Sequence, residues 1–405
     1  MTSKKYLLKT EFIAKLQPEK KIKFKKDFKW DASTKFAEID LKARSYKVNK
    51  DIDKLIDTKV KAISFFSGAG GLDIGAQLAN AQVISALDFD KDSIKTLKAN
   101  PCFKYSQHLL GDIRNSKGKD YEKLIKEKKP DKLIIIGGPP CQPFSKAGYW
   151  VTHEQRLGSE DPRNMIGQYL RIIGELKPNG FILENVESLL HPKNIAEVDL
   201  LKETIDKLGY NFIQYRADAI NFGVPQKRKR VFFIASKKKI IDEPKITHGL
   251  LQDLFTPSNL LPIERVVDWI APYDDQKFSE IEELTTGKTY FNELLEIPPG
   301  ENYFALTERE KYPNPKFEAN KRFWNFLLKL HPLQPSWTVS AQPGPWVGPF
   351  HWNNRRLRVP EIAAIQTFPS DYNFVGSRRS IQKQIGNAVP VLLGQAMIEF
   401  LLSKI

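Results

Sequence analysis

The feature that most constrains the fold is an alternation of short apolar runs with amphipathic segments between Val60 and Ser236. Apolar runs of this length, rich in Ile, Val and Phe, are typical of buried strands, and the segments between them repeat apolar residues at helical spacing. Strands that alternate with helices build a mostly parallel, doubly wound α/β sheet with helices on both faces. The strand stretches are 60–71, 82–90, one before Gly111, 131–141, 181–186 and two within 211–236; the helix stretches are 72–81, 90–100, 164–178 and 198–210.

The alternation ends after Ser236. Residues 237 to about 335 are rich in Pro and in charge, and they predict a second, smaller and irregular domain. Order returns with a short predicted helix at 359–369, and the chain ends in an apolar helix, 391–405, that must dock on the first domain. The predicted parts are a basic N-terminal extension, 1–57, a first domain, 58–238 plus 378–405, and a second domain, 239–377.

The charge of the chain indicates a polyanionic partner. The formal net charge is +15, which favours nucleic acid, although a merely lysine-rich composition is the alternative. Residues 1–50 alone hold fourteen Lys and one Arg against six acidic residues. This basic segment is either a flexible phosphate-binding arm or a small β-rich element, because its periodicity is too weak to decide.

The cysteine content and the hydropathy exclude several classes of protein. Two cysteines, Cys102 and Cys141, cannot build a disulfide framework or a cysteine-based zinc site, and the six histidines show no ligand-like spacing. No run of about 18 apolar residues predicts a membrane span, and the N-terminus lacks the apolar region of a signal peptide. We expect a cytosolic protein without a metal.

The first predicted strand enters a glycine-rich turn, FFSGAGGLD, at 65–73. Such a turn lets the backbone approach a ligand at the carboxyl edge of the sheet, although a tight turn without a ligand is the alternative. Asp88 ends the second strand and can accept bonds from ribose hydroxyls, Phe89 can stack on adenine, and Asp112 lies near the adenine amino group. The chain has no phosphate-binding lysine motif, so a nucleoside without a triphosphate is favoured. S-adenosylmethionine fits these features.

A second group of residues points to nucleophilic chemistry at the same edge. Cys141 follows Pro139-Pro140 in IIIGGPPCQPFS, directly after the fourth predicted strand, which is a position for a presented thiolate. The next strand ends in ENV and places Glu184 there. In QKRKR, strand alternation puts Arg228 and Arg230 on one face, where they can hold a carboxylate, a carbonyl oxygen or a phosphate.

With these blocks in this order, the sequence resembles the DNA cytosine-5 methyltransferase family. The matched blocks are FSGAGGLD, LDFD, GDI, GGPPCQPFS, ENV, QKRKR and IGNAVPV, spread from Phe65 to Val391. The resemblance implies a Rossmann-like S-adenosylmethionine-dependent fold with a target-recognition domain at 239–377. It also implies an enzyme that flips a cytosine out of duplex DNA and methylates carbon 5.

The resemblance assigns the catalytic roles. Cys141 would add to carbon 6 of the cytosine, and Glu184, protonated, would contact N3 and the exocyclic amino group. Arg230 would hold O2 and orient Glu184, and Arg228 would lie beside the nucleophile or the target phosphate.

Further residues are assigned to the cofactor and to DNA. The implied cofactor residues are Phe66, Gly68, Gly71, Leu72, Asp88, Phe89, Asp112, Ile113, Pro139, Asn387 and Ala388. The implied DNA contacts are Gln142, Ser145, Arg163 and Thr338. For Arg355, Arg356 and Arg358, DNA phosphates and internal salt bridges are equally good expectations.

The resemblance favours the modification enzyme of a bacterial restriction system. It would be a monomer acting on double-stranded DNA in the bacterial cytoplasm, associated with the nucleoid through DNA, and paired functionally with a restriction endonuclease of the same specificity. Two alternatives stay open: the tRNA-methylating branch of the family, and a catalytically silent DNA-binding regulator.

Overall fold

The computed structural model describes residues 4–9, 36–48, 57–140, 165–249, 259–283 and 285–405. At its centre lies a seven-stranded sheet of order β5-β4-β3-β6-β7-β9-β8. β9 pairs antiparallel with β7 and β8, and the other neighbouring strands of this sheet are parallel. The strands are β3 (Val60–Phe65), β4 (Gln82–Asp88), β5 (Gln107–Leu110), β6 (Lys132–Gly137), β7 (Gly180–Val186), β8 (Asn211–Asp218) and β9 (Lys229–Ser236). The predicted α/β class with a mostly parallel sheet is confirmed.

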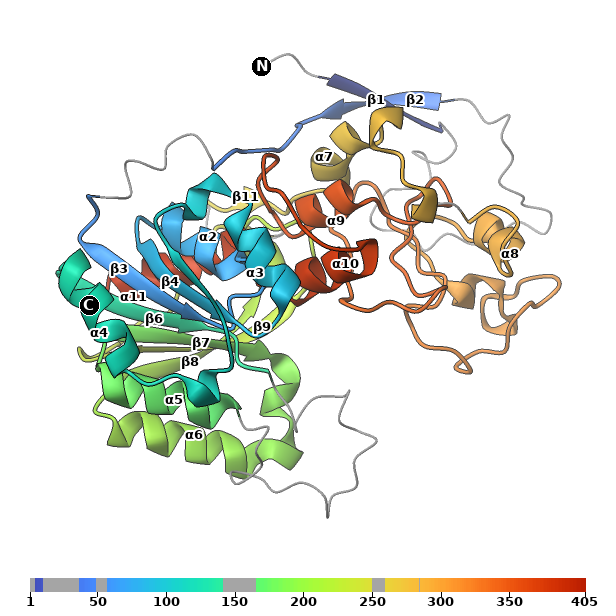
Figure 1. Cartoon of the computed structure of the whole chain (residues 1–405). Helices are drawn as coiled ribbons and strands as arrows, with labels where there is room; N and C mark the ends of the chain where they lie inside the picture. Colours follow the sequence, from blue (N-terminus) through green and yellow to red (C-terminus); the bar gives the residue numbers. More distant parts are fainter. Residues whose placement is uncertain (1–3, 10–35, 49–56, 141–164, 250–258, 284) are drawn as a thin grey trace.

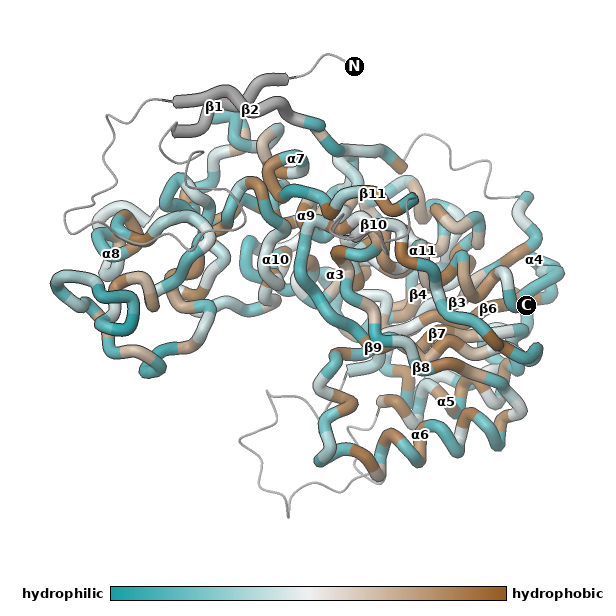
Figure 2. Tube along the Cα trace, turned by 180° about the vertical axis from the view of Figure 1, so that it is seen from behind, coloured by the Kyte–Doolittle hydropathy of each residue, from teal (hydrophilic) through white to brown (hydrophobic). Residues whose placement is uncertain are grey.

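Helices cover both faces of the sheet (Figure 1). One face carries α2 (Gly71–Leu78), α3 (Lys91–Lys98) and α11 (Val391–Leu402), and the other carries α4 (Lys119–Lys128), α5 (Met165–Leu176) and α6 (Ile195–Lys207). The isoleucines of β6 show why its sequence is continuously apolar. Ile134 and Ile136 belong to the first core and Ile135 to the second, because successive side chains of a strand point to opposite faces. Hydrophobic residues accordingly run along the central strands (Figure 2).

The C-terminal helices complete the first domain. α10 (Arg378–Asn387) and α11 together form a stretch, Arg378–Leu402, that is long and apolar enough to cross a membrane by length and composition alone. Pro390 precedes α11 and separates the two helices. α11 packs so closely on α2 that a Cβ at Gly75 would lie 2.7 Å from the backbone nitrogen of Gln395. This apolar stretch therefore serves as a core element of the sheet domain, in agreement with the predicted docking of the last helix.

The irregular region is divided between two cores. Around α8 (Phe291–Glu296) a small separate cluster includes Tyr303, Phe326 and Phe350. In contrast, α7 (Val266–Ile270) and α9 (Val359–Ile365) pack into the core that also holds α2 and α11. The predicted limits of the second domain, 239–377, therefore enclose segments that share the core of the first.

The remaining elements are short. β1 (Lys4–Lys9) pairs antiparallel with β2 (Phe36–Leu41), so the described part of the N-terminal segment matches the β-rich alternative. β10 (His248–Gly249) pairs with β11 (Leu261–Pro262). Short 3-10 helices are η2 (Pro101–Phe103), η3 (Ile113–Asn115), η7 (Glu187–Leu190), η8 (Pro192–Asn194), η9 (Ala219–Phe222), η10 (Ala271–Tyr273), η11 (Gln276–Phe278), η12 (Ile281–Glu283), η13 (Tyr303–Leu306) and η14 (Glu308–Glu310).

Candidate active site

The glycine turn after β3 leaves open space at one residue and makes close contact at another. Gly68 has φ +54°, a conformation that residues with a Cβ rarely adopt, and an added Cβ would meet no atom within 4 Å. At Gly71 a Cβ would lie 2.3 Å from the carbonyl oxygen of Val389. Gly71 therefore lets the turn pack against the C-terminal IGNAVPV block, whereas Gly68 leaves space that a ligand can fill. On either side of these glycines, Phe66 is half-buried, with φ 56°, and Leu72 is buried.

Asp88, at the end of β4, binds the backbone of this turn through its carboxylate. Its Oδ2 accepts a hydrogen bond from the backbone N–H of Gly68 and its Oδ1 accepts one from that of Asp90, both at 2.7 Å. Burial raises the pKa of Asp88, and these two hydrogen bonds oppose the shift. Each carboxylate oxygen keeps a lone pair for a ribose hydroxyl. The ring of Phe89 is 78% exposed and offers a face for stacking.

Asp112 has a partner that the sequence did not indicate. Arg114 ion-pairs with it, with Nη2 2.5 Å from Oδ2, and this side-chain hydrogen bond lowers the pKa of Asp112. The Asp112 carboxylate also caps η3 by accepting from the backbone N–H of Arg114. Ile113 is buried beneath. An adenine amino group would have to share the Asp112 carboxylate with Arg114.

The loop that leads to the cysteine is fixed by strand β7. A Cβ at Gly138 would lie 2.8 Å from Oε2 of Glu184, so the second glycine of GGPPC leaves room for that carboxylate. The carbonyl oxygen of Pro139 accepts a hydrogen bond of 3.0 Å from the buried Asn185 side chain. Asn185, in the ENV block, was not singled out from sequence, although its position beside Glu184 was the available signal. Four predicted residues lie outside the described residues: Cys141, Gln142, Ser145 and Arg163.

Glu184 and Arg230 form an ion pair between β7 and β9. The Arg230 Nε lies 2.9 Å from Glu184 Oε1, and both side chains are almost buried. Burial raises the pKa of Glu184, while the positive charges of Arg230 and Arg228 oppose the rise. Burial also lowers the pKa of Arg230, against the effect of the carboxylate. A buried carboxyl group with one arginine contact can hold a proton more readily than an exposed one.

Arg228 serves a different purpose from the phosphate contact that the sequence allowed. Its side chain is 1% exposed, and it donates to the carbonyl oxygens of Val339 at 3.3 Å, Gly386 at 2.7 Å and Ala388 at 3.2 Å. A guanidinium enclosed by backbone carbonyls cannot reach a DNA phosphate. Arg228 also precedes β9, which begins at Lys229. It ties the start of that strand to the C-terminal turn.

The C-terminal turn is held by buried glutamine side chains. Asn387 is exposed at the end of α10, and Ala388 follows it. The buried Gln366 side chain donates to the carbonyl oxygens of Ile385 at 2.7 Å and Ala388 at 3.2 Å. Gln226 donates in turn to Oε1 of Gln366 at 2.8 Å. These two glutamines, which sequence reasoning missed, join the QKRKR block to IGNAVPV.

Thr338 lies beside the segment that leads into β9. Its side chain is exposed, and its Oγ1 donates to the carbonyl oxygen of Lys227 at 2.7 Å. The preceding Ser336 forms a β-bridge with Gln226. The segment around Thr338 is therefore held against the start of β9, and its contact with DNA stays a prediction.

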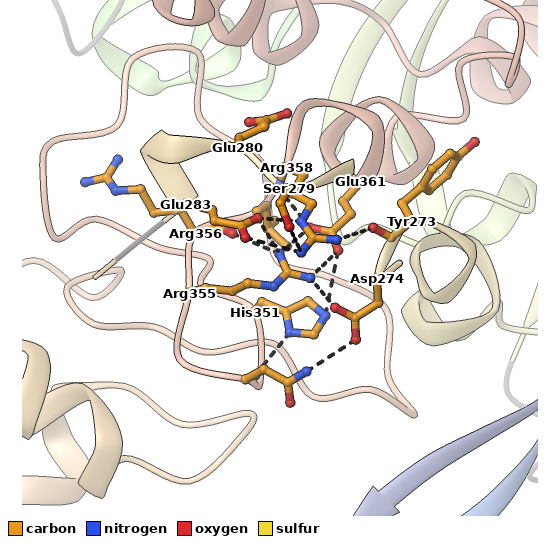
Figure 3. A network of polar contacts seen from close by, with 12 residues as sticks. Tyr273, Asp274, Ser279, Glu280, Glu283, His351, Arg355, Arg356, Arg358 and Glu361 are labelled. Carbon is orange, nitrogen blue, oxygen red and sulfur yellow. Dashed lines mark hydrogen bonds and ion pairs between the residues drawn. The ribbon is translucent and has the colours of Figure 1, made fainter. Parts of the chain in front are cut away.

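The three arginines of RRLRVP differ in their contacts (Figure 3). Arg355 binds Glu361 at 2.8 and 2.6 Å and Asp274 at 2.7 Å, and Arg358 binds Glu283 and the carbonyl oxygens of Tyr273 and Asp275. Both are internal salt bridges. Arg356 points away from this network and has no carboxylate partner within the described residues. Its Nη2 donates to the carbonyl oxygen of Pro345, and a phosphate contact of Arg356 stays a prediction.

One group among the described residues has side chains close enough to suggest a metal site. The ligand atoms of Asp274, His351 and Glu361 lie within 4.8 Å of one another. Arg355 already binds both carboxylates, and burial lowers the pKa of His351. The arginine thus supplies the positive charge that a metal would bring.

Comparisons with known proteins agree with this arrangement. Residues 60–403 match the family model described as C-5 cytosine-specific DNA methylase. The Type II methyltransferase M.SacI of Streptomyces achromogenes is 36% identical over 373 residues, covering 86% of this chain and 94% of the relative. The Type II methyltransferase M.NgoPII of Neisseria gonorrhoeae is 30% identical over 341 residues, covering 82% and 93%.

Solved structures show the same fold. The Entamoeba histolytica methyltransferase EhMeth superposes with a TM-score of 0.57 at 16% identity, covering 85% of this chain and 98% of that one. The S. pombe Dnmt2 methyltransferase gives 0.55 at 17% identity with the same coverage. The chain belongs to the C-5 cytosine-specific DNA methylase family, and it is a DNA cytosine-5 methyltransferase that uses S-adenosylmethionine.

Proposed function

We propose that Cys141, Glu184 and Arg230 form the catalytic centre for a cytosine flipped out of duplex DNA. The ion pair of Glu184 with Arg230 carries this proposal, because Glu184 lies beside Gly138, which directly follows β6 and stands three residues before Cys141. The cysteine sulfur forms a bond to carbon 6, which makes carbon 5 a nucleophile. Glu184, protonated, donates to N3 and accepts from the amino group, and Arg230 donates to O2. Once carbon 5 has accepted a methyl group, loss of its proton and departure of the Cys141 sulfur from carbon 6 release 5-methylcytosine.

The residues at the carboxyl ends of β3 and β4 fit the cofactor. Gly68 leaves space, Asp88 offers acceptors to a ribose and Phe89 offers an aromatic face. Bound there, S-adenosylmethionine supplies an electrophilic methyl group. Ile113 and Pro139 are assigned to the floor of this site, and Asn387 and Ala388 to its methionine end. Arg228 is assigned to positioning, since it holds the turn that carries Ala388.

The cellular setting is proposed from the relatives, which are named Type II methyltransferases. The enzyme would protect bacterial DNA in the cytoplasm alongside an endonuclease of the same specificity. We expect a monomer, because one chain carries all the proposed groups, and we expect no metal requirement. Sedimentation of the purified chain and activity in the presence of EDTA test these two expectations.

The decisive experiment combines the purified protein, labelled S-adenosylmethionine and plasmid DNA, followed by base-resolution mapping of 5-methylcytosine. We expect one recurring sequence to be methylated. Cys141→Ser should bind the cofactor and transfer no methyl group. Methylation of tRNA alone, or unchanged transfer by Cys141→Ser, would contradict the proposed site.

A further inference from the structure

Three aromatic rings and two cations form a continuous row. Its rings lie in residues 239–377, which we call the recognition region because the family resemblance assigns target recognition to them. The guanidinium of Arg309 lies 5.3 Å from the ring of Phe304, which lies 5.8 Å from Trp324. Trp324 meets Trp337 edge-on at 5.9 Å, and the Lys227 ammonium lies 4.6 Å from the Trp337 ring. We call Phe304, Trp324 and Trp337 the aromatic row. A cation stands at each end of it.

The aromatic row is exposed at its middle although its support is buried. Trp324 is 55% exposed and the adjacent Phe323 is 82% exposed. Behind them, the buried Asn302 side chain donates to the Trp324 carbonyl oxygen at 2.6 Å, and the buried Tyr303 stacks on Phe304 at 4.6 Å. Large exposed aromatic side chains that are held rigidly from behind mark an interaction surface rather than loose packing.

The aromatic row begins beside the start of β9, the strand that carries the proposed catalytic Arg230. Trp337 precedes Thr338, whose hydroxyl donates to the Lys227 carbonyl oxygen at 2.7 Å, and Lys227 is followed by Arg228. From there the row runs outward across the recognition region to Arg309. A duplex with one cytosine at Glu184 would therefore meet the inner end of the row.

The charges favour DNA over a protein partner. Within the described residues, neither Lys227 nor Arg309 has a carboxylate within ion-pair distance, although Glu308 and Glu310 flank Arg309 in the chain. Aromatic side chains pack against the sugars and groove edges of a duplex, and unpaired cations bind its phosphates. Resting on the DNA-methylating function, we propose that Trp324 and Phe323 pack on the substrate duplex while Lys227 and Arg309 hold its phosphates.

The test measures the affinity of the full chain for a labelled duplex, cut from the plasmid used for mapping, at several salt concentrations. Trp324→Ala should raise Kd about tenfold without changing the salt slope, because stacking is uncharged. Lys227→Met and Arg309→Met should each reduce the slope by about one. Trp324→Phe, which keeps a ring, should retain most of the affinity.

Matched controls lie at the opposite edge of the sheet, beyond the end of β9. Ile241→Ala removes an 83% exposed hydrophobic side chain, and Lys239→Met removes an exposed lysine. Both should bind DNA as the wild type does. If Trp324→Ala, Lys227→Met and Arg309→Met all bind DNA with the wild-type affinity and salt slope, the proposal is wrong. The aromatic row would then be a candidate surface for a protein partner.

The wild-type methylation assay separates this proposal from the proposed function. A chain that binds DNA through the row but methylates none would refute the catalytic assignment alone. If Trp324→Ala lowers cofactor affinity or Tm, its weaker DNA binding could come from a damaged fold. The DNA affinity of Trp324→Phe and the salt slopes of Lys227→Met and Arg309→Met then test whether the aromatic row binds DNA.

Discussion

Glu184 must carry a proton when the cytosine adduct forms, and its surroundings affect that proton in opposite ways. Burial raises its pKa, and the ion pair with Arg230, 2.9 Å away, opposes the rise. The balance is still a raised pKa, so the neutral form persists to higher pH than in an exposed glutamate. This is the direction that the proposed chemistry requires.

We therefore predict that Glu184→Gln lowers kcat at least about a hundredfold, because a fixed amide cannot donate the carboxyl proton. Cofactor affinity should be unchanged. In the wild type, activity should fall as pH rises through the Glu184 pKa, and the variant should lose this limb. A pH profile of labelled methyl transfer measures both; an identical limb in the variant would assign it to another group.

Asp73 is a second buried carboxyl group, and it was not singled out from sequence. It is fully buried in α2, and burial raises its pKa from 3.8 to about 7. The hydroxyls of Ser64 and Ser67 are near enough to oppose the shift, yet neither carboxylate oxygen has a hydrogen bond of good geometry within the described residues. Folding therefore keeps a proton on Asp73 that the unfolded chain has lost at neutral pH.

This proton gives Asp73 a defined effect on stability. Its favourable contribution is fully present below about pH 4 and is lost as pH rises through about 7, since the folded pKa is the higher one. We predict that Asp73→Asn raises Tm relative to the wild type at pH 8 and has little effect at pH 4.5. Calorimetry at the two pH values is the measurement, and an equal difference at both would exclude the linkage.

At the scale of elements, the glycine turn between β3 and α2 contributes both to packing and to the space for a ligand. Gly71 permits contact with the C-terminal turn, and Gly68 permits a left-handed backbone under open space. Neighbouring glycines in one motif therefore have separable effects, one on packing and one on the ligand.

We predict that Gly71→Ala destabilises the fold by about 1–3 kcal/mol, because its Cβ would lie 2.3 Å from the Val389 carbonyl oxygen. Gly68→Ala should cost about 1–2 kcal/mol in backbone strain and should also weaken cofactor binding. Denaturant unfolding and titration calorimetry with S-adenosylmethionine separate the two effects. Normal cofactor affinity in folded Gly68→Ala would count against the proposed cofactor position.

At the scale of the whole molecule, the basic N-terminal segment is not a single detachable arm. Arg44 forms an ion pair of 2.9 Å with Glu264, and the Tyr46 hydroxyl donates to the Thr367 carbonyl oxygen at 2.5 Å. Residues 42–48 thus dock where α7 and the end of α9 meet. Residues 1–41, with eleven lysines against six acidic residues, hold the rest of its positive charge.

Two deletions should separate these parts. Removal of residues 1–41 should weaken DNA binding and flatten its salt dependence through lost counterion release. Removal of residues 1–57 should add a loss of about 2 kcal/mol in stability, because the docked contacts are lost as well. Salt-dependent binding and thermal unfolding of both truncations are the measurements. An unchanged salt slope in the shorter deletion would remove the N-terminal segment from the DNA interface.

The sequence alone determined the alternating fold and the edge of the sheet at which the blocks meet. Both follow from periodicity and chain order. The spacing of apolar residues shows which faces of a strand or helix are buried, and the carboxyl ends of parallel strands lie at the same edge of the sheet. Tertiary structure alone decided which groups meet across the chain. It placed Arg228 on backbone carbonyls, Arg355 on carboxylates and Trp324 beside Trp337, since each side chain's partners come from segments that the sequence does not bring together.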